Sequence, residues 1–139
     1  MPKDNLLRVV VVEDSEAFLL RLRAALSELP VKVVGSAANS TDAIAVIDRT
    51  KPDLVLLDVF LEDSSGVDVL RHLAKSKSKT RTLLMTSEQA DGLRSACFAL
   101  GAHRFLDKAG VILSLEEEVL SLINERAPSP GTEDGFETE

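Results

Sequence analysis

The sequence predicts an α/β fold in which a doubly wound, five-stranded parallel sheet carries helices on both faces. Short runs of branched apolar residues alternate along the chain with stretches whose apolar residues recur at helical spacing. The runs are nearly continuously apolar, as expected of strands that are buried on both faces. Strands that alternate with helices in this way are joined by right-handed crossovers, which place a parallel sheet between two helical layers.

The expected elements follow from where the apolar patterns start and stop. The strands cover residues 8–12, 31–35, 54–58, 82–85 and 104–106. The helices cover residues 16–29, 41–51, 67–74 and 88–100, and a last helix is marked by apolar residues from 115 to 123 and ends near 126. Asp14 or Ser15 can cap the first helix and Ser40 or Thr41 the second, while Gly101 ends the fourth.

The 139 residues fit one ordinary domain, which we expect over 8–126, after an N-terminal lead over 1–7 and before a disordered acidic tail over 127–139. The net charge of −7 argues against direct nucleic-acid binding, which needs clustered basic residues. No stretch is apolar for long enough to be a signal peptide or a membrane span, and Cys97 is the single cysteine. We therefore expect a reducing, cytoplasmic location without membrane insertion.

Polar residues stand where four of the five expected strands end. Glu13 and Asp14 follow the first strand, Asp58 ends the third, Thr86 follows the fourth and Lys108 comes shortly after the fifth. The carboxyl ends of parallel strands share one edge of the sheet, where ligands of such folds bind. Three acids so close together raise each other's pKa unless a cation neutralises them, and oxygen ligands suit a hard divalent ion. The expected ion is Mg²⁺.

This set of residues can carry out phosphoryl transfer. A carboxylate beside Mg²⁺ and a lysine can attack a phosphoryl group, because the cations balance the charge of the phosphoryl oxygens. Asp58 is the expected nucleophile because it stands alone, whereas Glu13 and Asp14 form an adjacent pair suited to holding metal.

The order and spacing of these residues resemble the receiver domain of two-component response regulators over roughly residues 8–126. The matching features are an acidic pair, a later acid, a glycine eight residues beyond it, a hydroxyl residue and an F-x-x-K pattern, namely Glu13, Asp14, Asp58, Gly66, Thr86, Phe105 and Lys108. The resemblance implies a flavodoxin-like sheet of order 2-1-3-4-5 in a stand-alone, single-domain form.

The resemblance also implies a function as a phosphoacceptor switch in signal transduction or a phosphorelay. Asp58 would accept a phosphoryl group from a sensor histidine kinase or a histidine phosphotransfer protein. Mg²⁺ would be bound by Asp14, Asp58 and the backbone carbonyl of Phe60, and by Glu13 mainly through water. Lys108 would contact a phosphoryl oxygen. Such a protein catalyses its own phosphorylation and dephosphorylation and is not a conventional enzyme.

Two further residues would act as the switch. Thr86 would move its hydroxyl toward the phosphoryl group, and Phe105 would rotate inward to fill the space. These movements would reshape the surface of the fourth helix, the fifth strand and the fifth helix for a downstream protein target.

Four features depart from the family pattern: Ala109, Phe60, Glu13 in place of the commoner aspartate, and a loop after Asp58 without its frequent proline. Ala109 stands where a proline usually follows the lysine, and because non-proline cis bonds are rare we expect a trans bond or a remodelled loop there. Phe60 is bulkier and less polar than the residue that many members carry, and it could slow the entry of hydrolytic water.

Other function classes stay open on the sequence. A pseudo-receiver would bind partners without being phosphorylated. An aspartate-nucleophile phosphatase would need two acids with one residue between them after the first strand, whereas Glu13 and Asp14 are adjacent. A nucleotide-binding protein would need a glycine-rich loop, and neither G-x-x-x-x-G-K-[ST] nor G-x-G-x-x-G occurs. Taken singly, Asp58 and Thr86 also fit helix caps, and Lys108 fits a surface position.

Overall fold

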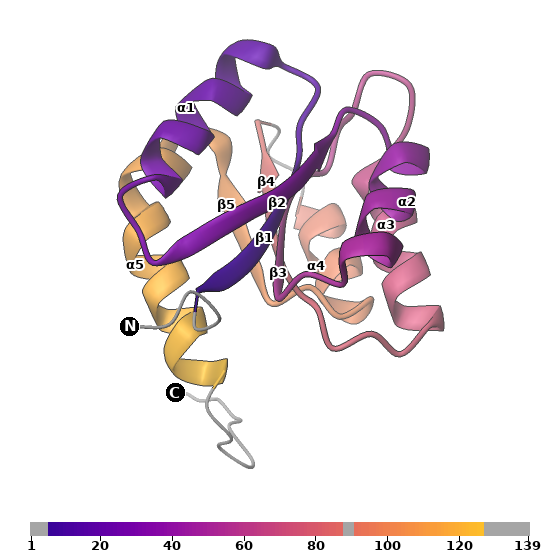
Figure 1. Ribbon diagram of the computed structural model, residues 1–139. Coiled ribbons are helices and arrows are strands. Elements are labelled where there is room, and N and C mark those ends of the chain that lie inside the picture. Colours follow the sequence, from indigo (N-terminus) through magenta and orange to yellow (C-terminus); the bar gives the residue numbers. More distant parts are fainter. Residues whose placement is uncertain (1–5, 88–90, 127–139) are drawn as a thin grey trace.

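The computed structural model of the protein describes residues 6–87 and 91–126 (Figure 1). Its strands form one parallel sheet in the order β2-β1-β3-β4-β5, which confirms the predicted fold class and strand order. The strands are β1 (Leu7–Val12), β2 (Val31–Ala37), β3 (Leu54–Asp58), β4 (Arg81–Thr86) and β5 (Arg104–Asp107). The helices are α1 (Glu16–Leu26), α2 (Ser40–Thr50), α3 (Gly66–Lys75), α4 (Asp91–Ala99) and α5 (Lys108–Arg126).

Some sequence-based expectations concern residues outside the described ranges. These are the tail over 127–139, most of the lead over 1–7, and residues 88–90 at the start of the predicted fourth helix. The division of the chain into lead, domain and tail therefore stays a prediction.

Helices cover both faces of the sheet. In Figure 1, α1 and α5 lie on one face, while α2, α3 and α4 lie on the other. Alternate side chains of β1 follow this division: Val9 and Val11 pack with α1 and α5, whereas Val10 and Val12 pack with α2 and α3. All four valines are completely buried. The central strands are thus held between two packed layers, and their carboxyl ends lie at one edge of the sheet.

The helix caps agree with the sequence for α1 but not for α2. Ser15 caps α1, and its Oγ accepts the backbone N–H of Phe18 at 3.2 Å. The expectation that Ser40 or Thr41 caps α2 is wrong, because Asn39 does so and Ser40 is already helical. The extended backbone of Asn39 lets its Oδ1 accept the N–H of Asp42 at 2.8 Å, which satisfies a first-turn donor.

The junction between β5 and α5 also differs from the sequence-based expectation. The apolar pattern marked the last helix only from residue 115, but α5 begins at Lys108, directly after β5. Oδ1 of Asp107 accepts the N–H of Ala109 at 3.0 Å and so supports the first turn. The described residues contain no cis peptide bond, which confirms the expected trans bond between Lys108 and Ala109. Lys108 therefore belongs to the first turn of a helix rather than to a loop.

Candidate functional site

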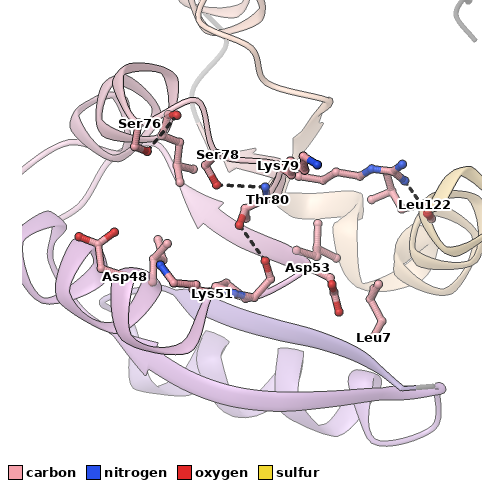
Figure 2. Close-up of a pocket in the computed structure, with 14 residues that line it drawn as sticks. Leu7, Asp48, Lys51, Asp53, Ser76, Ser78, Lys79, Thr80 and Leu122 are labelled. Carbon is pink, nitrogen blue, oxygen red and sulfur yellow. Dashed lines mark hydrogen bonds between the residues drawn. The ribbon is translucent and has the colours of Figure 1, made fainter. Parts of the chain in front are cut away.

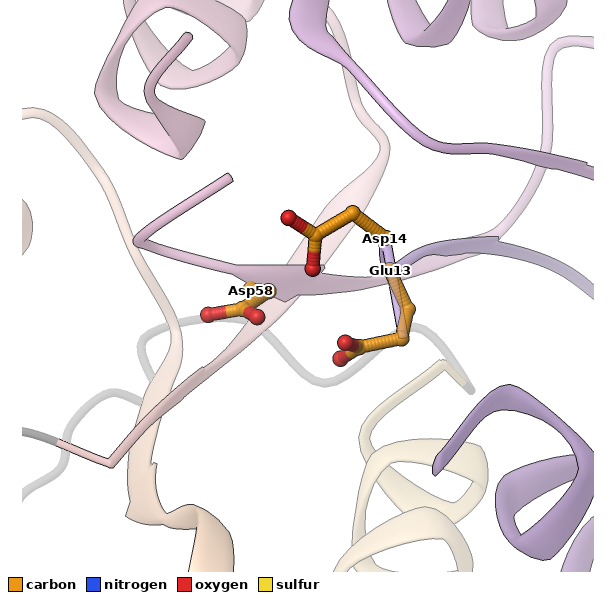
Figure 3. A group of neighbouring side chains, drawn as sticks. All are labelled: Glu13, Asp14 and Asp58. Carbon is orange, nitrogen blue, oxygen red and sulfur yellow. The ribbon is translucent and has the colours of Figure 1, made fainter. Parts of the chain in front are cut away.

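Three acidic side chains gather at the carboxyl ends of β1 and β3. Val12 pairs with Leu57 in the sheet, so the residues that follow them, Glu13 and Asp58, emerge level with each other. One carboxylate oxygen from each of Glu13, Asp14 and Asp58 lies within 4.8 Å of the others. Figure 3 shows the three carboxyl groups gathered beyond the ends of the two strands. The predicted acidic cluster is therefore present in the folded chain.

Lys108 joins this cluster from the start of α5. Its Nζ lies 3.0 Å from Oε2 of Glu13 and 3.0 Å from Oδ2 of Asp58, although these residues are 95 and 50 positions away in the sequence. The side chain of Glu13 is completely buried, and those of Asp58 and Lys108 are 4% and 18% exposed. With so little solvent around them, these charges are screened weakly and interact strongly.

Burial and neighbouring charges shift the pKa values of Glu13 and Lys108. Burial raises the pKa of Glu13, and the nearby charge of Asp58 adds to the rise, while the Ser15 amide and Lys108 oppose it. For Lys108, burial acts to lower the pKa, but the hydrogen bonds and charges of Glu13 and Asp58 together outweigh it and raise the pKa. The ammonium therefore keeps its proton between the two carboxylates.

One oxygen of this cluster lacks a protein partner. Oε1 of Glu13 is buried and has no hydrogen bond to any residue within 6–87 and 91–126. Leaving a buried carboxylate oxygen without a partner is costly in free energy, unless an ion or a water molecule binds it. Glu13, Asp14 and Asp58 together offer an all-oxygen donor set of the kind that hard divalent cations prefer.

The carboxylate of Asp58 is held in a fixed orientation. Its Oδ2 accepts from Lys108, and its Oδ1 accepts the backbone N–H of Phe60 at 3.1 Å. Phe60, two residues beyond Asp58, is 47% exposed. The proposed use of the Phe60 carbonyl as a metal ligand stays a prediction.

Gly66 explains how α3 can start so close to Asp58. A Cβ atom on Gly66 would lie 2.5 Å from the backbone carbonyl oxygen of Asp58 and 3.1 Å from Cα of Val59. The N–H of Gly66 also donates to the carbonyl of Val59 at 2.8 Å. The sequence singled out Gly66 only by its spacing, and the structure supplies the reason, since a side chain there would displace the backbone that carries Asp58.

The two predicted switch residues lie on the neighbouring strands β4 and β5. Thr86 is the buried last residue of β4, one position beyond Met85, which pairs with Asp58 in the sheet. Phe105 is buried on β5, and the guanidinium of Arg94 lies 5.5 Å from its ring centroid. The sheet therefore places Thr86 next to the strand end that carries Asp58 and Phe105 one strand further away, and their switching roles stay predictions.

Sequence reasoning missed Arg94 and Phe18. Arg94 lies over Phe105 and donates to its backbone carbonyl at 3.3 Å, and the ring of Phe18 lies 4.6 Å from Nζ of Lys108. Phe18 counted only as one apolar residue of the first helix, and a contact with a residue 90 positions away leaves no periodic signal in one sequence.

A cavity of about 590 Å³ lies at the opposite end of the sheet and is separate from the acidic cluster. Its lining includes Leu7, Leu54 and Arg81, the first residues of three strands. Figure 2 shows the Oγ1 of Thr80 bonded to a backbone oxygen there, the carbonyl of Pro52, at 2.7 Å. The cavity contains none of the predicted site residues, so the candidate chemistry belongs to the carboxyl edge.

The fold and the site together define a class of protein. The family model described as the response regulator receiver domain matches residues 9–119, and the chain belongs to this family. This confirms the resemblance drawn from the sequence.

Individual relatives agree with this assignment. A protein-glutamate methylesterase/protein-glutamine glutaminase of Alkalilimnicola ehrlichii is 32% identical over 136 residues, which cover 89% of this chain and 35% of that protein. The response regulator protein VraR of Staphylococcus aureus is 33% identical over 82 residues, or 58% of this chain and 39% of that protein. The chain thus spans well under half the length of these relatives.

Solved structures show the same fold. The signal receiver domain of a protein from Vibrio parahaemolyticus, described as a Luxo repressor, superposes with a TM-score of 0.81 at 28% identity. The match covers 86% of this chain and 92% of that one.

Among the helices of residues 6–87 and 91–126, none is long and apolar enough to cross a membrane.

Proposed function

We propose that this chain is a phosphoacceptor switch of two-component signalling, in which Asp58 receives a phosphoryl group from a phosphohistidine donor. The observation that carries the proposal is the position of the Lys108 ammonium, 3.0 Å from both Glu13 and Asp58 at the ends of β1 and β3. Membership of the receiver family supports it, because receiver domains act with histidine kinases and downstream effectors.

The proposed transfer is a substitution at phosphorus. A carboxylate oxygen of Asp58 forms a bond to phosphorus while the bond between phosphorus and the donor imidazole nitrogen breaks. The imidazole leaves with the electron pair and is protonated from solvent, and Asp58 becomes an acyl phosphate. The Lys108 ammonium would exchange its contact with Oδ2 of Asp58 for a contact with a phosphoryl oxygen.

The donor set fits a divalent cation, and we propose Mg²⁺. Asp14, Asp58 and the carbonyl of Phe60 would bind it directly, and Glu13 would bind it mainly through water. The partnerless Oε1 of Glu13 supports this assignment, because it is a buried oxygen that a hydrated cation would satisfy. When bound, Mg²⁺ supplies positive charge that screens the phosphoryl oxygens from the attacking carboxylate.

The output side of the switch would involve Thr86 and Phe105. Phosphorylation would draw the Thr86 hydroxyl toward Asp58, and Phe105 would follow on the adjacent strand. The ring centroids of Phe105 and Phe98 of α4 lie 6.3 Å apart, and Phe98 is partly exposed. A movement of Phe105 would therefore shift a side chain on the exposed face of that helix. That face would then meet a downstream protein.

The test uses a small acyl phosphate in place of the natural donor. The chain is incubated with acetyl phosphate and Mg²⁺ and then measured by intact mass, with the variants D58N and D63N alongside. Asp63 is an exposed acid in the loop that follows β3 and serves as the matched control. The proposal predicts one added phosphoryl group on the wild type and on D63N, and none on D58N.

Two outcomes would contradict the proposal. A wild type that takes up no phosphoryl group under these conditions would favour a pseudo-receiver that binds partners without phosphorylation. An adduct of equal yield on D58N would show that another residue is the acceptor.

A further inference from the structure

The aromatic ring of Phe18 lies against the ammonium of Lys108. Nζ of Lys108 is 4.6 Å from the ring centroid, within the range of a cation–π interaction. Phe18 stands in the first turn of α1 and is half-buried at the border of the apolar core under α1 and α5. Lys108 therefore has an aromatic neighbour in addition to its two carboxylates.

The residue that binds Lys108 also positions Phe18. Oε2 of Glu13 accepts the backbone N–H of Ser15 at 3.0 Å as well as the Lys108 ammonium. Ser15 caps α1, and its Oγ accepts the N–H of Phe18 at 3.2 Å. The contacts thus form a closed circuit from Glu13 through Ser15 and Phe18 to Lys108 and back.

We propose that Phe18 is a positioning residue for Lys108 during phosphoryl transfer, an inference that rests on the proposed function of Asp58. An ammonium has three N–H donors and no acceptor, and two of its contacts here are with Glu13 and Asp58. The ring face attracts the positive charge without offering an oxygen that would compete with the phosphoryl group. It also shields one side of the ammonium from water.

The length of the Lys108 side chain explains why a positioning contact would matter. The side chain of Lys108 starts from the first turn of α5, and its flexible four-carbon stem must reach the ends of β1 and β3. Ordering such a stem carries an entropy cost in each reaction cycle. When Asp58 carries the phosphoryl group, Lys108 must release Oδ2, and the contacts with Glu13 and Phe18 then keep the ammonium in place.

The test compares three variants of the full chain. F18L keeps apolar bulk but removes the ring, F18Y restores a ring, and L20A alters an apolar side chain of α1 that is 67% exposed. Two quantities are measured: the rate of phosphorylation over a series of acetyl phosphate concentrations at saturating Mg²⁺, and the ¹H shift of the Lys108 Hε protons. The shift reports the ring directly, because protons over an aromatic face are displaced upfield.

The expected result is that F18L lowers the maximal phosphorylation rate about three- to tenfold, as for loss of a partly buried cation–π contact, and removes the upfield Hε shift. F18Y should retain both properties, and L20A should behave as the wild type. A wild-type rate in F18L, or an equal loss in F18L and F18Y, would overturn the positioning role. If the Hε protons of the wild type show no upfield shift before acetyl phosphate is added, the positioning role is also overturned, even when Asp58 can be phosphorylated. If these protons are shifted but no phosphoryl group is taken up, only the proposed function is contradicted.

Discussion

Replacing Gly66 by alanine should both destabilise the domain and slow its phosphorylation. Gly66 is the first residue of α3, and its N–H donates to the carbonyl of Val59. A Cβ there would lie 2.5 Å from the carbonyl oxygen of Asp58, whereas ordinary contacts begin near 3.4 Å, so a displacement of about 0.9 Å is needed. The nearest atom belongs to the backbone, and the second and third contacts, with Cγ of Leu57 and Cα of Val59 at 3.1 Å, are also shorter than ordinary contacts.

The size of the effect follows from two opposing contributions. Overpacking of this kind costs about 1–3 kcal/mol, while the gain in helix propensity from glycine to alanine is at most about 1 kcal/mol and smaller at a helix start. We expect the free energy of unfolding to fall by about 1–2 kcal/mol, which leaves the domain folded. Displacing Asp58 by a large fraction of an ångström should lower the phosphorylation rate by about 10- to 100-fold.

Gly92 provides the matched control. It lies in α4, and among the described residues no atom beyond its chain neighbours and the backbone of its own helix stands within 4 Å of the position that its Cβ would take, so G92A should be neutral or stabilising. Unfolding in urea is followed by circular dichroism, because the chain has no tryptophan or tyrosine for fluorescence, and the phosphoryl adduct is followed by intact mass. Equal stability and equal phosphorylation of G66A and the wild type would refute the steric argument.

Two further predictions concern the acidic cluster and a histidine outside it. Mg²⁺ should raise the free energy of unfolding of the wild type, by about 2.7 kcal/mol at 100 times its dissociation constant, and chelation should reverse the gain; a similar gain in D58N would mean that Asp58 is not a ligand. For His103, desolvation of the ring and the charges of Arg81 and Arg104 lower the pKa, and Nδ1 accepts the N–H of Thr82 at 3.2 Å. Since the unfolded chain then binds more protons below a pH of about 6.5, stability should fall on acidification through that value. Urea titrations at two pH values should show a smaller fall in H103Q than in the wild type, and equal falls would contradict the assignment.

The acidic cluster could be predicted from the sequence because its members are tied to strand ends. Glu13 and Asp58 each follow a continuous aliphatic run, and the parallel sheet makes such positions neighbours whatever their separation in the chain. Lys108 could be included on the same ground, since the fifth strand ends beside it. The parallel strand order thus brings most of the site residues together.

Local geometry could not be predicted in the same way. The start of α5 was missed because Gly110, Val111 and Ile112 are weak helix formers, and only the side chain of Asp107 shows that the helix begins there. The cap of α2 was missed because Asn39, Ser40 and Thr41 are all capable of capping, and their order of preference is decided by backbone angles.

The position of Lys108 links the two kinds of information. Its ammonium joins the ends of β1 and β3, while its backbone opens α5, whose buried residues Val111 and Leu115 pack in the same core as α1. The position of the lysine α-carbon is therefore fixed by helix packing, and the position of its ammonium is fixed by the carboxylates at the strand ends. Phe18 connects the two, because it borders that core and contacts the ammonium. A site assembled by the sheet alone would leave this long side chain free to choose among rotamers. Packing of α1 against α5 would restrict that choice, and a residue that reads as ordinary core in the sequence would then bear on the chemistry proposed for Asp58.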